Sequence, residues 1–173
     1  RAAAEQSLVD SSADLALVFE PVRMMEFQVL LTIRQPLHVV MNSKHPLAKN
    51  ETLRLRDALI YPVALPSHEY GVRHLLEIAA RSTSQTIKPV VESDSFEFLS
   101  HYTTFEDILA FQIEIGVPPR LGKTELVSRP LDFRDVPPGL LYFGQLRGRT
   151  LPVAAARFAH QMMESLATRF ECE

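Results

Sequence analysis

Short apolar runs alternate with amphipathic stretches along the whole chain, and this alternation limits its fold more than any other feature. The run LALVF at residues 15–19 and the run from Ile60 to Leu65 are nearly uniformly apolar. Such runs fit strands that are buried on both faces of a parallel sheet. Residues 70–81 instead place apolar side chains at helical spacing. The pattern predicts an α/β fold with mostly parallel sheets.

The expected elements follow from the same patterns. We expect strands at residues 15–19, 25–33, 37–41, 60–65, 87–93, 107–113, 125–131 and 140–146. We expect helices at residues 2–13, 53–59, 70–81, 95–102 and 150–170. The last helix has Pro152 in its first turn, where a missing N–H is harmless. Its apolar stripe, which includes Phe158, is predicted to be buried.

Composition narrows the function classes. The 173 residues carry a net charge of −3, and the 18 lysines and arginines are scattered. A domain that binds nucleic acid by itself normally has a basic face. Because this chain has a negative net charge and scattered basic residues, we expect no direct DNA contact. The single cysteine, Cys172, cannot form an internal disulfide. No apolar run has the length of a membrane span, so we expect no membrane contact.

Catalytic and metal-binding patterns are missing from the sequence. There is no G-x-S-x-G nucleophile motif and no glycine-rich phosphate loop. No two of the six histidines stand at a zinc-type spacing with a carboxylate or a cysteine, and they read as surface or turn residues. His45 and Pro46 are expected to shape a turn after a strand. We therefore expect no enzyme, no metal and no cofactor.

Polar side chains gather where the strand at 60–65 gives way to the helix at 70–81. Ser67, His68 and Tyr70 occupy this turn. In open parallel sheets, ligands bind beyond the carboxyl ends of the strands, and free N–H groups at a helix start suit a carboxylate. Ser67 fits a ligand contact and a helix cap equally well. Arg73 could clamp a carboxylate, although a solvated helix face is the commoner place for such a side chain.

A second turn repeats this arrangement after the strand at 87–93. Ser93, Ser95 and Phe96 are the candidate ligand residues here, while Asp94 is favoured as the helix cap. Phe19 ends the strand at 15–19 and would face the same cleft, although a plain turn is slightly favoured there.

Four segments, in order, resemble the effector-binding domain of LysR-type transcription regulators. The first is Asp14–Val18, and the second is the strand LHVVM followed by Lys44–Ala48, which is similar to an HPLA turn. The third is the helix at 53–59 leading into Ile60–Val63. The fourth is Glu125–Leu131, followed by a strand and a final alanine-rich helix. The sequence departs from the family at Phe105–Asp107, where a Gly-x-Gly is common.

The resemblance implies two lobes, as in periplasmic binding proteins. Residues 1–37 and 135–173 would form lobe I, which lacks its opening strands and helix, and residues 38–134 would form lobe II. A small organic effector, such as a carboxylate, would bind between the lobes. The effector-binding residues would be Ser67, His68, Tyr70, Arg73, Ser93, Ser95, Phe96 and Phe19.

The resemblance also implies partners and a location. The domain would form a homodimer or homotetramer in the cytoplasm. It would reach DNA only through a helix-turn-helix domain that this chain does not contain. Two alternatives stay open: a periplasmic solute-binding protein of a transporter, which shares the two-lobe architecture, and a small enzyme on an α/β fold.

Overall fold

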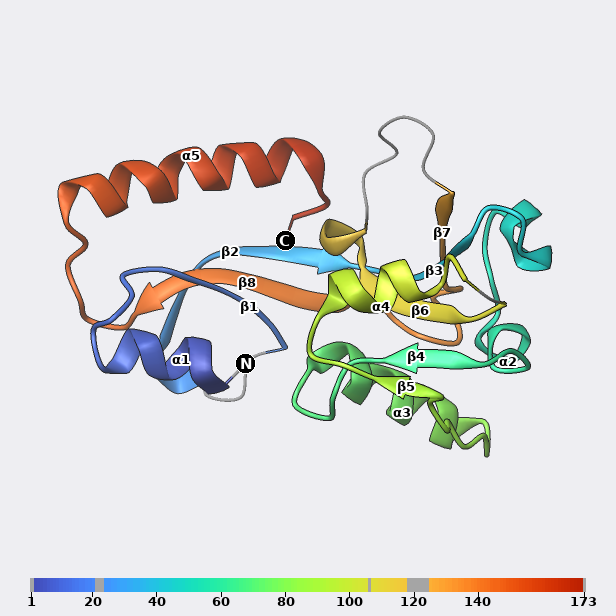
Figure 1. Ribbon diagram of the computed structural model, residues 1–173. Coiled ribbons are helices and arrows are strands. Elements are labelled where there is room, and N and C mark those ends of the chain that lie inside the picture. The colour runs from blue at the N-terminus through green and yellow to red at the C-terminus, as the bar shows by residue number, and fades with distance from the viewer. Residues whose placement is uncertain (1, 21–23, 106, 118–124, 173) are drawn as a thin grey trace. The chain divides into compact units, whose positions relative to one another are not determined.

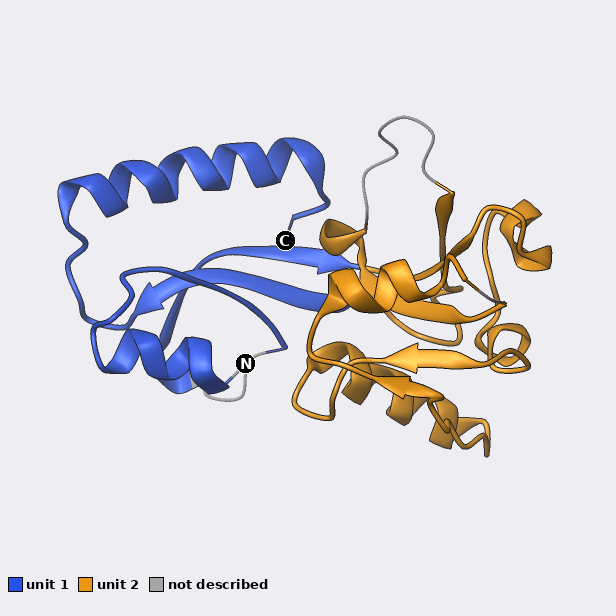
Figure 2. Cartoon of the chain, viewed as in Figure 1, with its two compact units in different colours: residues 1–35, 139–173 blue, residues 36–138 orange. Residues whose placement is uncertain are grey.

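The computed structural model describes residues 2–20, 24–105, 107–117 and 125–172. The chain divides into two compact units, which Figure 2 shows in different colours. Unit 1 contains residues 1–35 and 139–173, and unit 2 contains residues 36–138. The chain therefore passes between the units twice, first at Pro36 and again before Gly139. Each unit has a sheet of its own (Figure 1).

Unit 1 is built on a three-stranded sheet with the order β1-β8-β2. Both pairings are antiparallel, with Val18 opposite Tyr142 and Ile33 opposite Leu141. Its elements are α1 (Ala2–Val9), β1 (Ala16–Phe19), the 3-10 turn η1 (Met24–Glu26), β2 (Phe27–Gln35), β8 (Gly139–Leu146) and α5 (Val153–Arg169). A cluster of Leu8, Val18 and Phe27 forms a core between α1 and the sheet.

Unit 2 is built on a five-stranded sheet with the order β5-β4-β6-β3-β7. Its strands are β3 (Leu37–Asn42), β4 (Val63–Leu65), β5 (Val91–Glu92), β6 (Leu109–Ile113) and β7 (Leu126–Pro130). Its helices are α2 (Leu55–Ala58), α3 (Gly71–Ser82) and α4 (Phe96–Tyr102), with 3-10 turns η2 (Pro46–Lys49) and η3 (Glu114–Gly116). Val40, Ala64, Leu99 and Ala110 are fully buried together in its core.

The predicted helices and strands all occur, but the prediction of mostly parallel sheets is wrong. Among the named strands of the described residues, β4 alone pairs in parallel, with β5 and with β6. The other four pairings, β1–β8, β2–β8, β3–β6 and β3–β7, are antiparallel. A short apolar run does not determine the direction of its neighbour. In β1, Val18 is buried whereas Leu17 is 39% exposed, so this strand is covered on one face rather than two.

The long helix α5 is less buried than its apolar stripe predicts. Ala159 and Leu166 are buried, but Phe158 is 53% exposed, so its predicted burial is wrong. The main contact of the helix within the described part of the chain is with β2, and this contact covers a narrow arc of its surface. After the helix the chain returns to β2, where Ile33 forms a bridge with Cys172. Among the described residues, no helix combines the length and apolar character that a membrane crossing needs.

Candidate functional site

The turn after β4 begins helix α3 without a side-chain cap. Tyr70 is the N-cap residue, with extended backbone angles, and its side chain makes no hydrogen bond to the helix. Its N–H donates to the carbonyl of Ser67 at 3.2 Å. Ser67 is half-buried and three residues before the cap. The reading of Ser67 as the helix cap is therefore wrong.

Helix α4, which begins at the turn after β5, has a side-chain N-cap. Ser95 is the N-cap of α4, and its Oγ accepts the N–H of Phe98 at 3.1 Å. Oγ of Ser93 accepts the N–H of Ser95 at 3.2 Å. The prediction that Asp94 caps this helix is wrong, because the following serine reaches the helix N–H groups instead.

The structure brings these two turns together. Strands β4 and β5 run in parallel, so the turns that follow them open at the same edge of the sheet. The rings of Tyr70 and Phe96 meet edge to face, with centroids 5.2 Å apart and an angle of 87° between their planes. The hydroxyl of Tyr70 donates to the carbonyl of Asp94 at 3.3 Å. Six of the eight predicted site residues lie on these turns, namely Ser67, His68, Tyr70, Ser93, Ser95 and Phe96.

Arg73 lies just beneath these turns rather than on a solvated helix face, so that expectation is wrong. The residue is only 4% exposed. Its Nε donates to Oε1 of Glu77 at 2.7 Å, and its Nη1 donates to Oε1 of Glu92 at 3.2 Å. Nη1 also lies 3.3 Å from the carbonyl oxygen of Pro66. The guanidinium therefore ties α3 to both strand ends.

His68 joins this network from the surface. Its Nδ1 lies 3.1 Å from Oε1 of Glu77, and its Nε2 lies 3.4 Å from Nη2 of Arg73. Partial burial raises the pKa of the Glu77 carboxyl, but the hydrogen bond and charge of Arg73 outweigh it and bring the pKa below its ordinary value. The turn thus holds one buried cation between two carboxylates.

Sequence reasoning missed both carboxylates of this network. Glu77 follows Arg73 by four residues, which is the spacing of ion pairs on one helix face. The sequence could therefore have predicted this ion pair. Glu92 is brought in by its position opposite Leu65 in the parallel register, and the sequence carries no signal for that pairing.

Phe19, the eighth predicted residue, ends β1 in unit 1 and is half-buried. Its backbone pairs with Leu141, and the next residue, Glu20, has a positive φ of 50°. The side chain of Glu20 accepts the N–H of Leu140 at 2.7 Å, which closes this strand end. Among the described residues, no group of three or more histidine, cysteine, aspartate or glutamate side chains is placed to hold a metal ion.

The comparison with protein families gives a match over nearly the whole chain. The LysR substrate binding domain matches residues 1–167. The chain belongs to this family. LysR substrate-binding domains are the effector-binding regulatory domains of LysR-type transcription regulators and are not enzymes. The predicted family is confirmed, and it argues against both the solute-binding protein and the small enzyme.

Solved structures of regulators share this fold. HinK, a LysR family transcriptional regulator from Pseudomonas aeruginosa, is 19% identical with a TM-score of 0.76, and the match covers 96% of this domain and 57% of HinK. The effector-binding domain of QuiR, in complex with shikimate, is 17% identical with a TM-score of 0.78, over 96% and 78% of the two chains. The CcmR regulatory domain of Synechocystis, in complex with 2-PG, is 17% identical with a TM-score of 0.80, over 95% and 79%.

At these identities the likeness shows the fold alone. The domain spans little more than half of the HinK chain. A comparison with curated proteins finds no match.

Proposed function

We propose that this domain binds a small organic effector at the paired turns Ser67–Tyr70 and Ser93–Phe96. The observation that carries the proposal is that parallel pairing of β4 and β5 opens both turns at one sheet edge, where Tyr70 packs against Phe96. The complexes of QuiR with shikimate and of CcmR with 2-PG support a small metabolite as the class of effector.

The chemistry of the turns favours an effector with a carboxylate. Helix α3 has 12 residues, and the side chain of its N-cap residue accepts no hydrogen bond from the first turn, so the positive end of the helix would attract an anion. Helix α4 is already capped by Ser95. The hydroxyl of Ser93 accepts a backbone N–H and keeps its own proton to donate to a ligand oxygen.

The remaining predicted residues complete the proposed site. Arg73 and His68 would lie beside the carboxylate, with Glu77 and Glu92 holding the guanidinium in place and His68 packed against it. We also propose Phe19 as an effector-binding residue, because it stands at the carboxyl end of β1 and ligands of α/β folds bind at such strand ends. We propose that the two compact units are the two lobes of the effector-binding domain.

The regulator as a whole would be longer than this chain. Because the domain covers 57% of HinK, we propose that a separate helix-turn-helix domain contacts DNA. We also propose that the domain forms a homodimer or homotetramer. The effector would act by binding one arrangement of the lobes more tightly than another, which shifts the population between them.

A ligand screen followed by one pair of variants tests the site. Small carboxylic acids that raise the melting temperature of the domain are taken to isothermal titration. The double variant Ser67→Ala with Ser93→Ala should bind the hit about thirtyfold more weakly, because each of the two hydroxyls contributes about 1 kcal/mol. Ser82→Ala, at the far end of α3, is the matched control. Unchanged affinity in a folded double variant would show that the turns do not bind the effector.

A further inference from the structure

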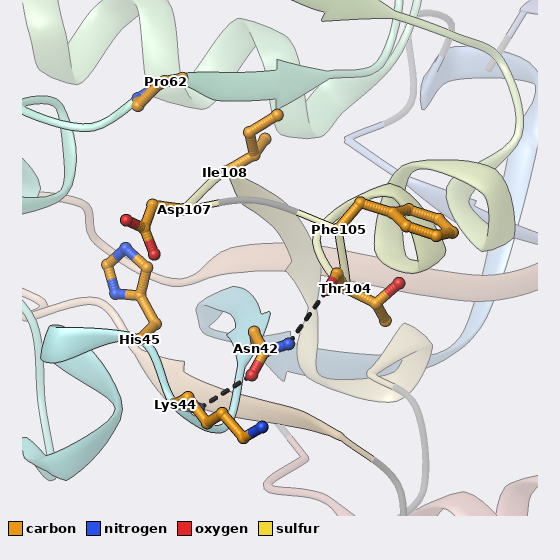
Figure 3. Close-up of a pocket in the computed structure, with 8 residues that line it drawn as sticks. All are labelled: Asn42, Lys44, His45, Pro62, Thr104, Phe105, Asp107 and Ile108. Atoms are coloured by element: carbon orange, nitrogen blue, oxygen red, sulfur yellow. Dashed lines mark hydrogen bonds between the residues drawn. The ribbon is translucent and has the colours of Figure 1, made fainter.

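A pocket lies in unit 2 at the end of the parallel strands opposite to these turns (Figure 3). Its volume is about 490 Å³, and it is lined by Asn42, Lys44, His45, Pro62, Thr104, Phe105, Asp107 and Ile108. Pro62 precedes β4 and Ile108 precedes β6, whereas the turn at Ser67 follows β4. The pocket is therefore separate from the proposed effector site.

His45 places an unpartnered hydrogen-bond donor in this pocket. The residue is 3% exposed, and its Nδ1 accepts the N–H of Leu47 at 3.1 Å. A ring nitrogen that accepts carries no proton, so the proton of the neutral imidazole is on Nε2. Within the described part of the chain, Nε2 has no hydrogen-bond partner. Buried donors are rarely left in this state unless something outside the chain satisfies them.

The ring is neutral for a physical reason. Burial lowers the pKa of His45, and the charge of Asp107 opposes this only in part. The edge-to-face contact with Tyr61, at a centroid distance of 4.4 Å, fixes the orientation of the ring. The predicted role of His45 in the turn is confirmed, because its side chain caps η2, and the ring is buried there.

Asp107 supplies the complementary acceptor. Figure 3 shows its carboxylate on the side of the pocket that the imidazole faces. A metal ion does not suit this pair, because Nε2 carries a proton. An anion would meet the charge of Asp107, and a cation would meet the N–H of the ring. A hydroxyl suits both groups, since it accepts from Nε2–H and donates to the carboxylate.

The other walls fit a small carbon skeleton. Phe105 is 78% exposed at the rim, so the face of its ring is open to C–H groups. The side chain of Asn42 is held on both sides, since it accepts the N–H of Lys44 at 2.9 Å and donates to the carbonyl of Thr104 at 3.1 Å. A volume in the range of roughly 300–1,000 Å³ is typical of small-molecule sites and far exceeds one water.

We propose that this pocket binds a neutral polyhydroxy compound, with one hydroxyl between His45 Nε2–H and the Asp107 carboxylate and its carbon face against Phe105. The ligand is recognised by its lack of charge, in contrast to the carboxylate proposed for the turns at the opposite edge. The domain would thus sense two chemically different molecules at two separate sites.

Nuclear magnetic resonance of the imidazole nitrogens tests the proposal. Glucose, myo-inositol and mannitol are titrated against the domain, with gluconate and glucosamine as charged counterparts. At least one neutral polyol should shift the His45 Nε2–H signal, and the charged compounds should bind at least tenfold more weakly. If no polyol shifts the signal, water alone satisfies this donor and the proposal fails. Equal binding of the charged compounds would also overturn it.

Two variants locate the binding. His45→Asn keeps an N-cap acceptor for η2 but removes the pocket donor, and Asp107→Asn keeps the shape but removes the charge. Each should weaken polyol binding about tenfold, because His45→Asn loses the hydrogen bond from Nε2 and Asp107→Asn replaces a charge-assisted hydrogen bond by a weaker neutral one. If His45→Asn does not fold, Asp107→Asn and the titration of the parent domain still decide the question. Unchanged binding in a folded Asp107→Asn variant would contradict the proposal.

The two sites are distinguished by crossing the variants. Ser67→Ala with Ser93→Ala should leave polyol binding intact, and Asp107→Asn should leave binding of the carboxylate effector intact. A polyol whose binding falls with the serine variants instead would belong to the effector site, and the second site would be rejected.

Discussion

Arg54 and Asp135 form a two-point ion pair between residues 81 positions apart. Nε of Arg54 donates to Oδ2 of Asp135 at 2.8 Å, and its Nη2 donates to Oδ1 at 2.6 Å. Oδ2 also accepts the N–H of Leu55 at 2.8 Å. Because Arg54 is the N-cap of α2 and makes no side-chain cap of its own, Asp135 caps this helix from a distant part of the chain.

Removal of this distant cap should destabilise unit 2. We expect Asp135→Ala to lower the free energy of unfolding by about 1–2 kcal/mol, the usual cost of a lost N-cap. Asp135→Asn should cost less, because its carbonyl can still accept the N–H of Leu55. Urea denaturation measures both. Asp57→Ala, which removes an exposed ion pair with Arg56, is the control and should change little. Equal stabilities of Asp135→Ala and the parent domain would contradict the capping role.

Stability should fall as the pH drops below about 6.5. Burial lowers the pKa of both His38 and His45 from the ordinary value of 6.5. Below that value the unfolded chain binds protons at these rings while the folded chain does not, so acid favours unfolding. The stabilisation is complete above pH 6.5 and is lost as the pH falls towards the folded pKa values. Melting temperatures recorded from pH 8 to pH 5 should show this decline.

One substitution isolates the contribution of a single ring. His45→Asn should flatten the decline between pH 6.5 and pH 5, because asparagine does not titrate there. His101→Asn, on an exposed part of α4, serves as the control. A slope that persists unchanged in His45→Asn would mean that other groups cause it.

A second loss of stability is expected in stronger acid. The hydrogen bond from Arg54, opposed by partial burial, lowers the pKa of Asp135 below its ordinary value of 3.8. The stabilisation from this carboxylate is therefore complete above about pH 4 and disappears as the pH falls through the lowered pKa. Asp135→Asn should remove this step from an acid-unfolding curve, and a step of unchanged size in the variant would assign it to other carboxylates.

The sequence alone predicted the helices and strands, and it predicted the edge of the sheet at which the proposed site lies. Apolar runs marked β4 and β5, and the serines after them marked the turns. Strand direction was not predictable, because β1 and β4 have similar apolar runs but β1 pairs antiparallel and β4 in parallel. Pairing direction depends on which distant strand lies alongside.

Contacts between side chains that are distant in the sequence were not predictable either. The contact of Tyr70 with Phe96 and the approach of Glu92 to Arg73 depend on the register of β4 and β5. The burial of His45 depends on Tyr61, which follows α2. Local patterns predict caps and turns, whereas these contacts arise only when strands pair.

Arg73 should contribute to stability as well as to effector binding. A lysine ammonium offers a single point charge and cannot hold Glu77, Glu92 and the carbonyl of Pro66 together as the guanidinium does. We expect Arg73→Lys to lower the free energy of unfolding by about 1–3 kcal/mol, measured in urea. Arg81→Lys, an exposed residue that also pairs with Glu77, is the control and should have little effect. A parent-like stability for Arg73→Lys would mean that the network does not stabilise α3.

Self-association should depend on the exposed apolar side chains of α5. Val153 is 74% exposed and Phe158 is 53% exposed, and burial of such side chains against a second copy of the domain would favour the proposed dimer. Phe158→Glu places a charge in that contact and should shift sedimentation velocity profiles towards the monomer. Phe133→Glu is the matched control, since Phe133 is 72% exposed on unit 2 rather than on α5. Loss of the dimer with Phe133→Glu but not with Phe158→Glu would move the interface to unit 2, and a parent domain that sediments as a monomer at high concentration would exclude it.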